Sequence, residues 1–405
     1  MKRSELPVLI AIFLDLVGFG MAFPDVQLRA ESYGASGILI GAILASLFAV
    51  QFVASPKWGL LSDRIGRRPV AVICTALSSA SMLVYALSTN LWGILLSRVL
   101  AGLAAANVVV IQAYLADTST EVERGPAMGR IGAAISVGLI GGPVLGGQLS
   151  QLGGSQLLGY VAAAFSGIAA ICLFIGMKGI PPKEARSPGS RSIVDLSLIK
   201  SDRGFRALIL LAAVSWFALA CLEGTFGRLM EQRFTFPMSD LGLSFTKPQG
   251  VSGAVFGLES LVAFAVQGLL YVWISKRIQP SGLLRIGFFL QAIGLVMTPF
   301  VPSLGFILMF SSLYSIGTSI ANPTLNTVCS NRVDENRQGE LFGLLQASRS
   351  IGFLLGPIIG GALFDWHAAA PYVLAGGVSM AALLLVPVRY ADTSREGVKE
   401  EGEST

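Results

Sequence analysis

Long apolar runs dominate this chain and constrain its fold more than any other feature. A helix needs roughly 20 apolar residues to cross the hydrocarbon core of a bilayer. Only helices and closed barrels satisfy their own backbone hydrogen bonds in lipid. The sequence therefore predicts an all-α membrane protein with twelve transmembrane helices, at 6–27, 37–60, 70–88, 92–115, 128–150, 156–177, 205–228, 252–274, 282–301, 304–328, 340–364 and 370–388.

The composition supports a membrane protein and argues against a soluble one. Hydrophobic residues make up 53% of the 405 residues and charged residues only 13%, whereas an average soluble domain carries about 25% charged residues. The formal net charge is +5. The basic residues are distributed along the chain as membrane orientation requires, so we expect no nucleic-acid partner. The four cysteines have no metal-ligand spacing, and we expect small buried hydrophobes and no metal site: Cys74, Cys172, Cys221 and Cys329.

One motif, G-x-x-x-G-P-x-x-G-G, occurs once in each half of the chain, inside an apolar run each time. Small residues four apart let helix backbones approach closely in lipid, and a proline within a helix kinks it. Its two placements indicate a duplicated helical bundle. The fixed positions are Gly138, Gly142, Pro143, Gly146 and Gly147 in the first copy and Gly352, Gly356, Pro357, Gly360 and Gly361 in the second.

A stretch rich in Pro, Ser, Arg and Lys separates the two halves. We expect an N-terminal six-helix bundle at 1–177, a cytoplasmic linker at 178–204, a C-terminal six-helix bundle at 205–390 and a cytoplasmic tail at 391–405. Most of the 29 Lys and Arg residues lie in the linker, near the termini and in alternate links. By the positive-inside rule both termini then face the cytoplasm. The longest link on the other side, 231–251, is expected to form an irregular cap.

Several motifs resemble the major facilitator superfamily. The stretch from Gly59 to Pro69 resembles its loop signature, G-x-x-x-D-R-x-G-R-R/K, and Arg98 with Gly102 resembles its fourth-helix element. The first glycine motif is similar to the fifth-helix signature of the twelve-helix drug:proton antiporters, which include tetracycline and multidrug efflux pumps. This chain departs from the group at Asp25, which follows Pro24 where a P-x-x-P pattern usually continues.

The resemblance implies a latch in the loop after the second span. Asp63 would dock on the positive N-terminal end of the eleventh helix near Glu340, while Arg64 or Arg67 reaches Asp117. The alternative is that these charges only set the topology. The latch and its loop comprise Gly59, Asp63, Arg64, Gly66, Arg67, Arg68 and Asp117.

Ionisable groups inside spans are costly in lipid, so each is a candidate for proton coupling or substrate binding: Asp15, Arg98, Glu223, Glu259 and Arg349. A carboxyl that gains and loses a proton in the membrane can link proton movement to rocking of the two bundles. Asp15 has an alternative role in a hydrogen bond between helices, and Arg349 in reaching the interface. Gly224 and Gly227 predict a break in the seventh helix that exposes Glu223.

These features predict a secondary active transporter and not an enzyme. The sequence has no G-x-x-x-x-G-K-S/T loop for ATP and no catalytic or cofactor constellation. We therefore expect proton-coupled efflux of hydrophobic or amphipathic drug-like compounds by alternating access. The partners would be a small-molecule substrate, protons and the lipid bilayer of the bacterial inner (plasma) membrane, with the protein a monomer. The alternatives are a carrier of a lipid, sugar or metabolite on the same fold, and a non-transporting receptor or scaffold.

Overall fold

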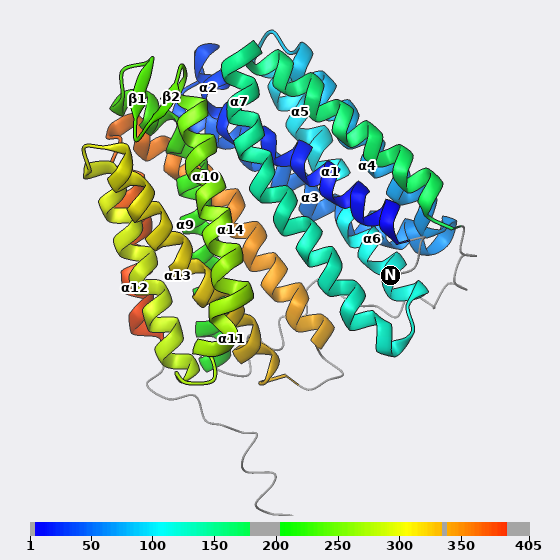
Figure 1. The fold of residues 1–405 in the computed structure, drawn as a ribbon. Coiled ribbons are helices and arrows are strands. Elements are labelled where there is room, and N and C mark those ends of the chain that lie inside the picture. Colours follow the sequence, from blue (N-terminus) through cyan, green and yellow to red (C-terminus); the bar gives the residue numbers. More distant parts are fainter. Residues whose placement is uncertain (1–4, 179–202, 334–337, 387–405) are drawn as a thin grey trace, which may run out of the picture.

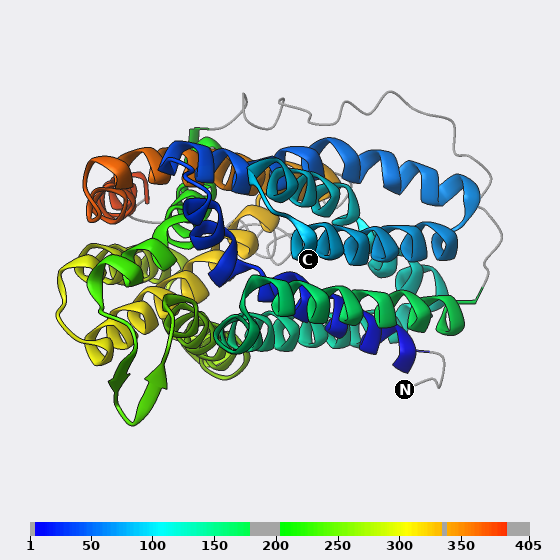
Figure 2. The ribbon, with the colours of Figure 1, turned by 90° about the horizontal axis from the view of Figure 1, so that it is seen from above.

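The structure is a computed structural model that describes residues 5–178, 203–333 and 338–386. Its helices form two groups that follow the two halves of the sequence (Figure 1; Figure 2). The first group consists of α1 (Leu6–Met21), α2 (Phe23–Ser32), α3 (Gly37–Ile65), α4 (Arg67–Leu87), α5 (Leu91–Ala104), α6 (Asn107–Thr118) and α7 (Glu121–Gly176).

The second group begins after the predicted linker and contains a small sheet. It consists of α9 (Arg203–Arg233), β1 (Met238–Asp240), β2 (Leu243–Phe245), α10 (Pro248–Ala265), η1 (Val266–Leu270), α11 (Tyr271–Ile274), α12 (Pro280–Met297), η2 (Thr298–Phe300), α13 (Leu304–Ser330), α14 (Gln338–Trp366), α15 (Ala370–Ala382) and η4 (Leu383–Leu385).

The helices confirm the all-α membrane prediction. Among the described residues, ten helical segments are long and apolar enough to cross a membrane. One of them, in α7, combines two predicted spans across a bend at Gly153 and Gly154, and the apolar helix Ala370–Leu385 is shorter. The count of twelve stays a prediction, as do the four domain boundaries. Most of the predicted linker and tail lies outside the described residues.

Three predicted spans are interrupted rather than straight. The first breaks at Ala22, two residues before Pro24, and the fourth breaks between α5 and α6. The eighth contains η1, a π-helical turn between α10 and α11. Such turns are rare and occur frequently at functional sites.

The predicted irregular cap at 231–251 is wrong, because this link contains a two-stranded antiparallel hairpin. Met238 pairs with Phe245 and Asp240 with Leu243. The turn residues Leu241 and Gly242 both have positive φ, as tight two-residue hairpin turns require. We call the end of the molecule with this sheet the hairpin end (top of Figure 1). The opposite end, where α1 begins and α3 meets α4, is the terminal end.

The repeated glycine motif packs in the same way in both halves. Gly142 in α7 faces Gly20 in α1, where an added Cβ would lie 2.8 Å from the Gly20 Cα. Gly356 in α14 faces Ala220 in α9, with an added Cβ 2.6 Å from the Ala220 Cβ. The motif therefore brings the fifth span against the first and the eleventh against the seventh. The predicted role of the small residues in close packing is confirmed at these positions.

The cysteines are free, as expected from their apolar surroundings. Cys74, Cys221 and Cys329 are buried and Cys172 is half-buried. Cys74 belongs to the apolar core of the first half, together with residues of α1, α6 and α7. Each half thus has its own core, and the contact between the halves forms a separate surface.

Candidate functional site

One seam between the halves is formed by α3 and α14, which run antiparallel. The Gly37 N–H donates to Asp365 Oδ2 at 2.6 Å, and Gly41 packs against the carbonyl of Pro357. Further along, the rings of Phe48 and Phe353 stack with their centroids 4.2 Å apart. This seam is therefore closed from the hairpin end to the middle of both helices.

The second seam lies between α7 and α10 and is also closed at the hairpin end. Gly147 packs against Gly253 and the Gln249 carbonyl. The Thr246 N–H donates to Gln151 Oε1 at 2.8 Å, and Lys247 Nζ donates to the Ser150 carbonyl at 3.0 Å.

Side chains between the two seams add contacts across the halves. Gln27 Nε2 donates to the Glu223 carbonyl at 2.9 Å, and the Gly227 N–H donates to Gln27 Oε1 at 3.1 Å. Arg228 lies 3.0 Å from both Glu31 and Asp365, and so links the first half to the second.

Toward the terminal end the same helices present glycines with open space beside them. An added Cβ would meet no neighbouring atom within 4 Å at Gly59 in α3, Gly132 in α7, Gly268 in η1 or Gly343 in α14. The two halves therefore meet at the hairpin end and separate toward the terminal end.

Two of the predicted ionisable residues come together where the seams end. Glu223 in α9 is half-buried and Arg349 in α14 is exposed, and the two charges attract each other. The Arg349 guanidinium lies over the Trp216 ring at 4.6 Å and 5.7 Å from the Phe353 centroid. A carboxyl, a guanidinium and aromatic rings therefore adjoin one another at mid-span. Such a set can bind a flat amphipathic molecule through stacking and charge.

The predicted break of the seventh helix at Gly224 is wrong, because α9 is continuous from Arg203 to Arg233. Gly224 packs against Pro357 and Gly227 against Gln27. These glycines admit neighbouring groups to the helix surface while the helix keeps its backbone hydrogen bonds. The exposure of Glu223 therefore does not come from a helix end, and its backbone carbonyl accepts a hydrogen bond from Gln27 of the other half.

Glu259 in α10 lies deeper, with only 9% of its surface exposed. Its Oε1 is buried without a hydrogen-bond partner among the described residues, and the Ser315 hydroxyl donates to its backbone carbonyl at 2.6 Å. The second half therefore holds two carboxyl groups inside its spans, and Glu223 is the more accessible of the two.

Asp15 lies inside the first half. It is 3% exposed, and Asn107 Nδ2 donates to its carboxyl. Asp15 is on α1 and Asn107 begins α6, so this hydrogen bond joins two interrupted spans. The structure thus provides the hydrogen bond between helices that was the alternative role for Asp15.

Arg98 in α5 is 4% exposed, and its guanidinium lies over the ring of Tyr85, 5.2 Å from the centroid. The Tyr85 hydroxyl donates to Asp25 Oδ2 at 2.6 Å. Neither Asp25 nor Tyr85 is predicted from the sequence as a neighbour of Arg98. The only signal at Asp25 is the departure from the P-x-x-P pattern, and Tyr85 is an aromatic residue within an apolar span.

The loop after the second span forms a charged cluster at the terminal end. Arg67 lies 2.6 Å from Asp63 and 3.2 Å from Asp117, so Arg67 makes the contact that the resemblance implied for it or Arg64. Gly66 separates α3 from α4 with φ +97°. Asp63 pairs with Arg67, whereas the side chains around Glu340 at the start of α14 lie outside the described residues, so the docking of Asp63 there stays a prediction.

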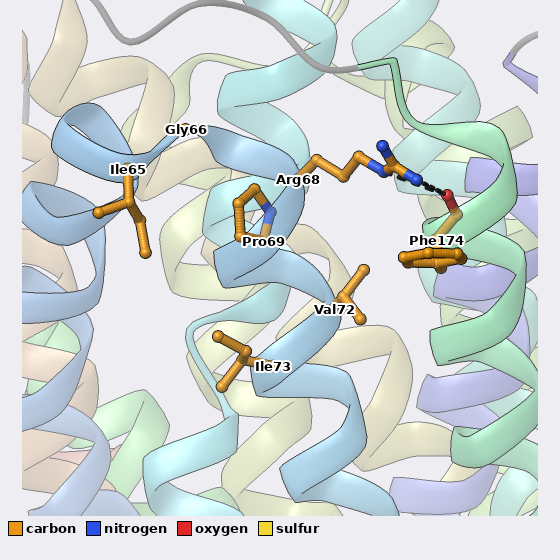
Figure 3. A pocket seen from close by; sticks show the side chains of 7 residues that line it. All are labelled: Ile65, Gly66, Arg68, Pro69, Val72, Ile73 and Phe174. Atoms are coloured by element: carbon orange, nitrogen blue, oxygen red, sulfur yellow. Dashed lines mark hydrogen bonds between the residues drawn. The ribbon is translucent and has the colours of Figure 1, made fainter.

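A cavity of about 380 Å³ lies beside the same loop (Figure 3). Ile65, Pro69 and Val72 help to line it, and Arg68 donates to the Phe174 carbonyl across it at 2.6 Å. Its lining comes from α3, α4 and α7 of the first half alone, so it is distinct from the region between the halves.

Comparison with known proteins agrees with this arrangement. A family model described as "Major Facilitator Superfamily" matches residues 8–339 and 224–405. The chain is 28% identical over 398 residues to multidrug resistance protein 2 of Bacillus subtilis, covering 96% of this chain and 95% of that one. It is 27% identical over 388 residues to quinolone resistance protein NorA of Staphylococcus aureus, covering 95% and 96%.

A solved structure shares the fold. It is a bacterial homologue of the human lysosomal transporter Spinster in an inward-facing, unoccupied conformation, with a TM-score of 0.74, 15% identity and 95% of each chain covered. The paired helical groups, the repeated glycine motif and the match along the whole chain lead to one conclusion: this protein belongs to the major facilitator superfamily, as its motifs predicted.

Proposed function

We propose that this protein is a proton-coupled exporter of hydrophobic or amphipathic drug-like compounds that works by alternating access. The observation that carries the proposal is the mid-span group of Glu223, Arg349 and Trp216, with Phe353 stacked on Phe48 of the other half. Charged side chains in a membrane are expensive. A pair left accessible between two halves is explained if it binds substrate or protons.

The substrate site uses the aromatic rings for stacking and Glu223 for a cationic group, while protonation of Glu223 releases that group. Glu259 contributes a second carboxyl behind Glu223. The efflux proteins among the relatives support this assignment over a carrier of lipids, sugars or metabolites.

The conformation also fits alternating access. With both termini in the cytoplasm, as the basic residues predict, the closed hairpin end is the outer face and the separated terminal end opens inward. The Asp63–Arg67–Asp117 cluster is then the latch that engages α14 when the terminal end closes. The carrier acts as a monomer in the plasma membrane and needs no cofactor.

Transport by purified protein in proteoliposomes tests the proposal. An imposed pH gradient should drive accumulation of a fluorescent lipophilic cation such as ethidium, and collapsing the gradient with an ionophore should stop it. Flux that does not depend on pH would contradict proton coupling. Absence of flux for ethidium, quinolones and other amphipathic compounds, with folded protein, would contradict export.

A further inference from the structure

A buried carboxyl group outside the proposed substrate site joins the two halves. Asp25 lies in the first turn of α2, after the break at Ala22, and is 0% exposed. It accepts hydrogen bonds from the Tyr85 hydroxyl at 2.6 Å, the Ser150 hydroxyl at 2.9 Å and Gln249 Nε2 at 3.2 Å. Tyr85 and Ser150 belong to the first half, whereas Gln249 belongs to the second.

The same carboxyl is tied to two buried cations. The guanidinium groups of Arg29 and Arg98 lie 4.6 and 5.2 Å from the centroid of the Tyr85 ring, whose hydroxyl bonds Asp25. Arg29 is further held by the Tyr85 and Ser88 carbonyls at 2.5 and 2.6 Å. Within the described residues Arg98 forms no ion pair with a carboxylate, and Asp25 is the acid to which Tyr85 connects it.

The donor set indicates what Asp25 contributes. An ionised carboxylate only accepts hydrogen bonds, and the three groups around Asp25 can all donate to it. A hydrogen bond to a charged group is stronger than one between neutral groups. When the halves separate at the hairpin end, Gln249 moves away, and Asp25 loses its only donor from the second half among these three.

We propose that Asp25 is a positioning residue that couples Arg98 to the closure of the hairpin end. This inference rests on the proposed alternating access, in which the hairpin end opens and closes. The charge at Arg98 orients Tyr85 and Asp25, and Asp25 in turn holds Gln249 of the other half. Because coupling between sites is reciprocal, closing the hairpin end also fixes the surroundings of Arg98.

Distances between spin labels test this without measuring transport. Leu152 and Trp366 are 80% and 81% exposed at the hairpin end of the first and second halves. Cysteines at these positions carry the labels, in a background whose four native cysteines are replaced by alanine. We expect Asp25→Asn and Gln249→Ala each to lower the closed-to-open ratio about tenfold, the loss expected for roughly 1.4 kcal/mol.

Double variants separate coupling from simple weakening. If Asp25 acts through Gln249, the double variant Asp25→Asn/Gln249→Ala shifts the ratio no further than either single variant. If it transmits the charge of Arg98, then Arg98→Gln changes the ratio in the parent protein and not in the Asp25→Asn background. Additive effects in both double variants, or unchanged distances in Asp25→Asn, would overturn the inference.

Asp240→Asn is the matched control, because Asp240 is an acid at the same end that bonds Leu304 within its own half. It should leave the distance distribution unchanged. Should Asp25→Asn fail to fold, Gln249→Ala and Tyr85→Phe still test the same connection. A shift in distances without any drug flux would retain this inference and reject the proposed export, and flux without the shift would do the reverse.

Discussion

At the scale of single residues, the second half concentrates the accessible charge. Glu223 is half-buried and Arg349 exposed, whereas Asp15, Arg98 and Glu259 are at most 9% exposed. A carboxyl that must meet both water and substrate has to be accessible, which favours Glu223 as the principal coupling group. Glu259, behind it, can tune Glu223 through charge.

Replacing Glu223 by Gln removes a proton-binding group but keeps the side chain's size and hydrogen-bonding capacity. We expect proton-driven efflux to fall by about tenfold or more, while the amount of folded protein stays the same. Dye uptake into everted membrane vesicles energised by respiration, which corresponds to efflux from the cell, measures this. Glu231→Gln is the control on the same helix, at an exposed position of the hairpin end, and should retain efflux. Normal proton-driven efflux by Glu223→Gln would contradict the assignment.

Asp15 should behave differently, because Asn107 donates to it inside one bundle. Asp15→Asn can still accept that hydrogen bond through its amide oxygen, so we expect efflux within about twofold of the parent protein. Asp15→Ala leaves the Asn107 amide without this partner, at a cost of about 1–3 kcal/mol. Thermal unfolding in detergent and dye uptake into everted vesicles measure the two effects. Loss of proton-driven efflux in folded Asp15→Asn would instead make Asp15 a coupling residue.

At the scale of helices, the two glycine motifs place α7 on α1 and α14 on α9 by removing side chains at the contact. The contact differs sharply along one helix. Gly142 has the Gly20 backbone against it, while Gly132, less than three turns away, has open space. A side chain added at these two positions therefore has opposite consequences.

Gly142→Ala should destabilise the protein by about 1–3 kcal/mol, because its Cβ would lie 2.8 Å from the Gly20 Cα and the helices would have to move apart. Gly132→Ala, the matched control, should be neutral or slightly stabilising, since alanine favours helix more than glycine does. Thermal unfolding of the purified variants distinguishes them. Equal stability of the two variants would show that this close approach is unimportant.

The sequence predicts the positions of the helices better than it predicts their breaks and contacts, and the reasons are physical. Apolar length and the repeated motif revealed the spans and the duplication, because both depend on local composition. The break at Ala22 has a local signal in Pro24, whereas the break before Asn107 has none. The predicted break at Gly224 is wrong because a glycine in a membrane helix allows close packing as readily as it allows a break. The role of Asp25 cannot be predicted from the sequence, because it depends on hydrogen bonds from Tyr85 and Gln249 that only the fold brings together.

At the scale of the whole molecule, the two seams follow simple antiparallel registers. In one, Gly37 meets Gly361, Gly41 meets Pro357 and Phe48 stacks on Phe353. In the other, Gly147 meets Gly253 and Gly257 meets Val144. Continued toward the terminal end, these registers place Gly59 opposite Gly343 and Gly132 opposite Gly268, the glycines that now have open space beside them.

We therefore expect these two pairs to approach each other when the hairpin end opens and the terminal end closes, because both seams would then rock about their middle. Cysteines at Gly59 and Gly343 should crosslink slowly in the conformation described here and several-fold faster when the terminal end is closed.

Asp63→Asn should reduce the fast crosslinking, since the latch would no longer hold α3 against α14, and should slow efflux with little loss of folded protein. A pair at Gly59 and Gly268, on different seams, is the control and should crosslink poorly throughout. Fast crosslinking that is insensitive to Asp63→Asn would separate closure of the terminal end from the latch, and no crosslinking in any state would contradict the rocking motion.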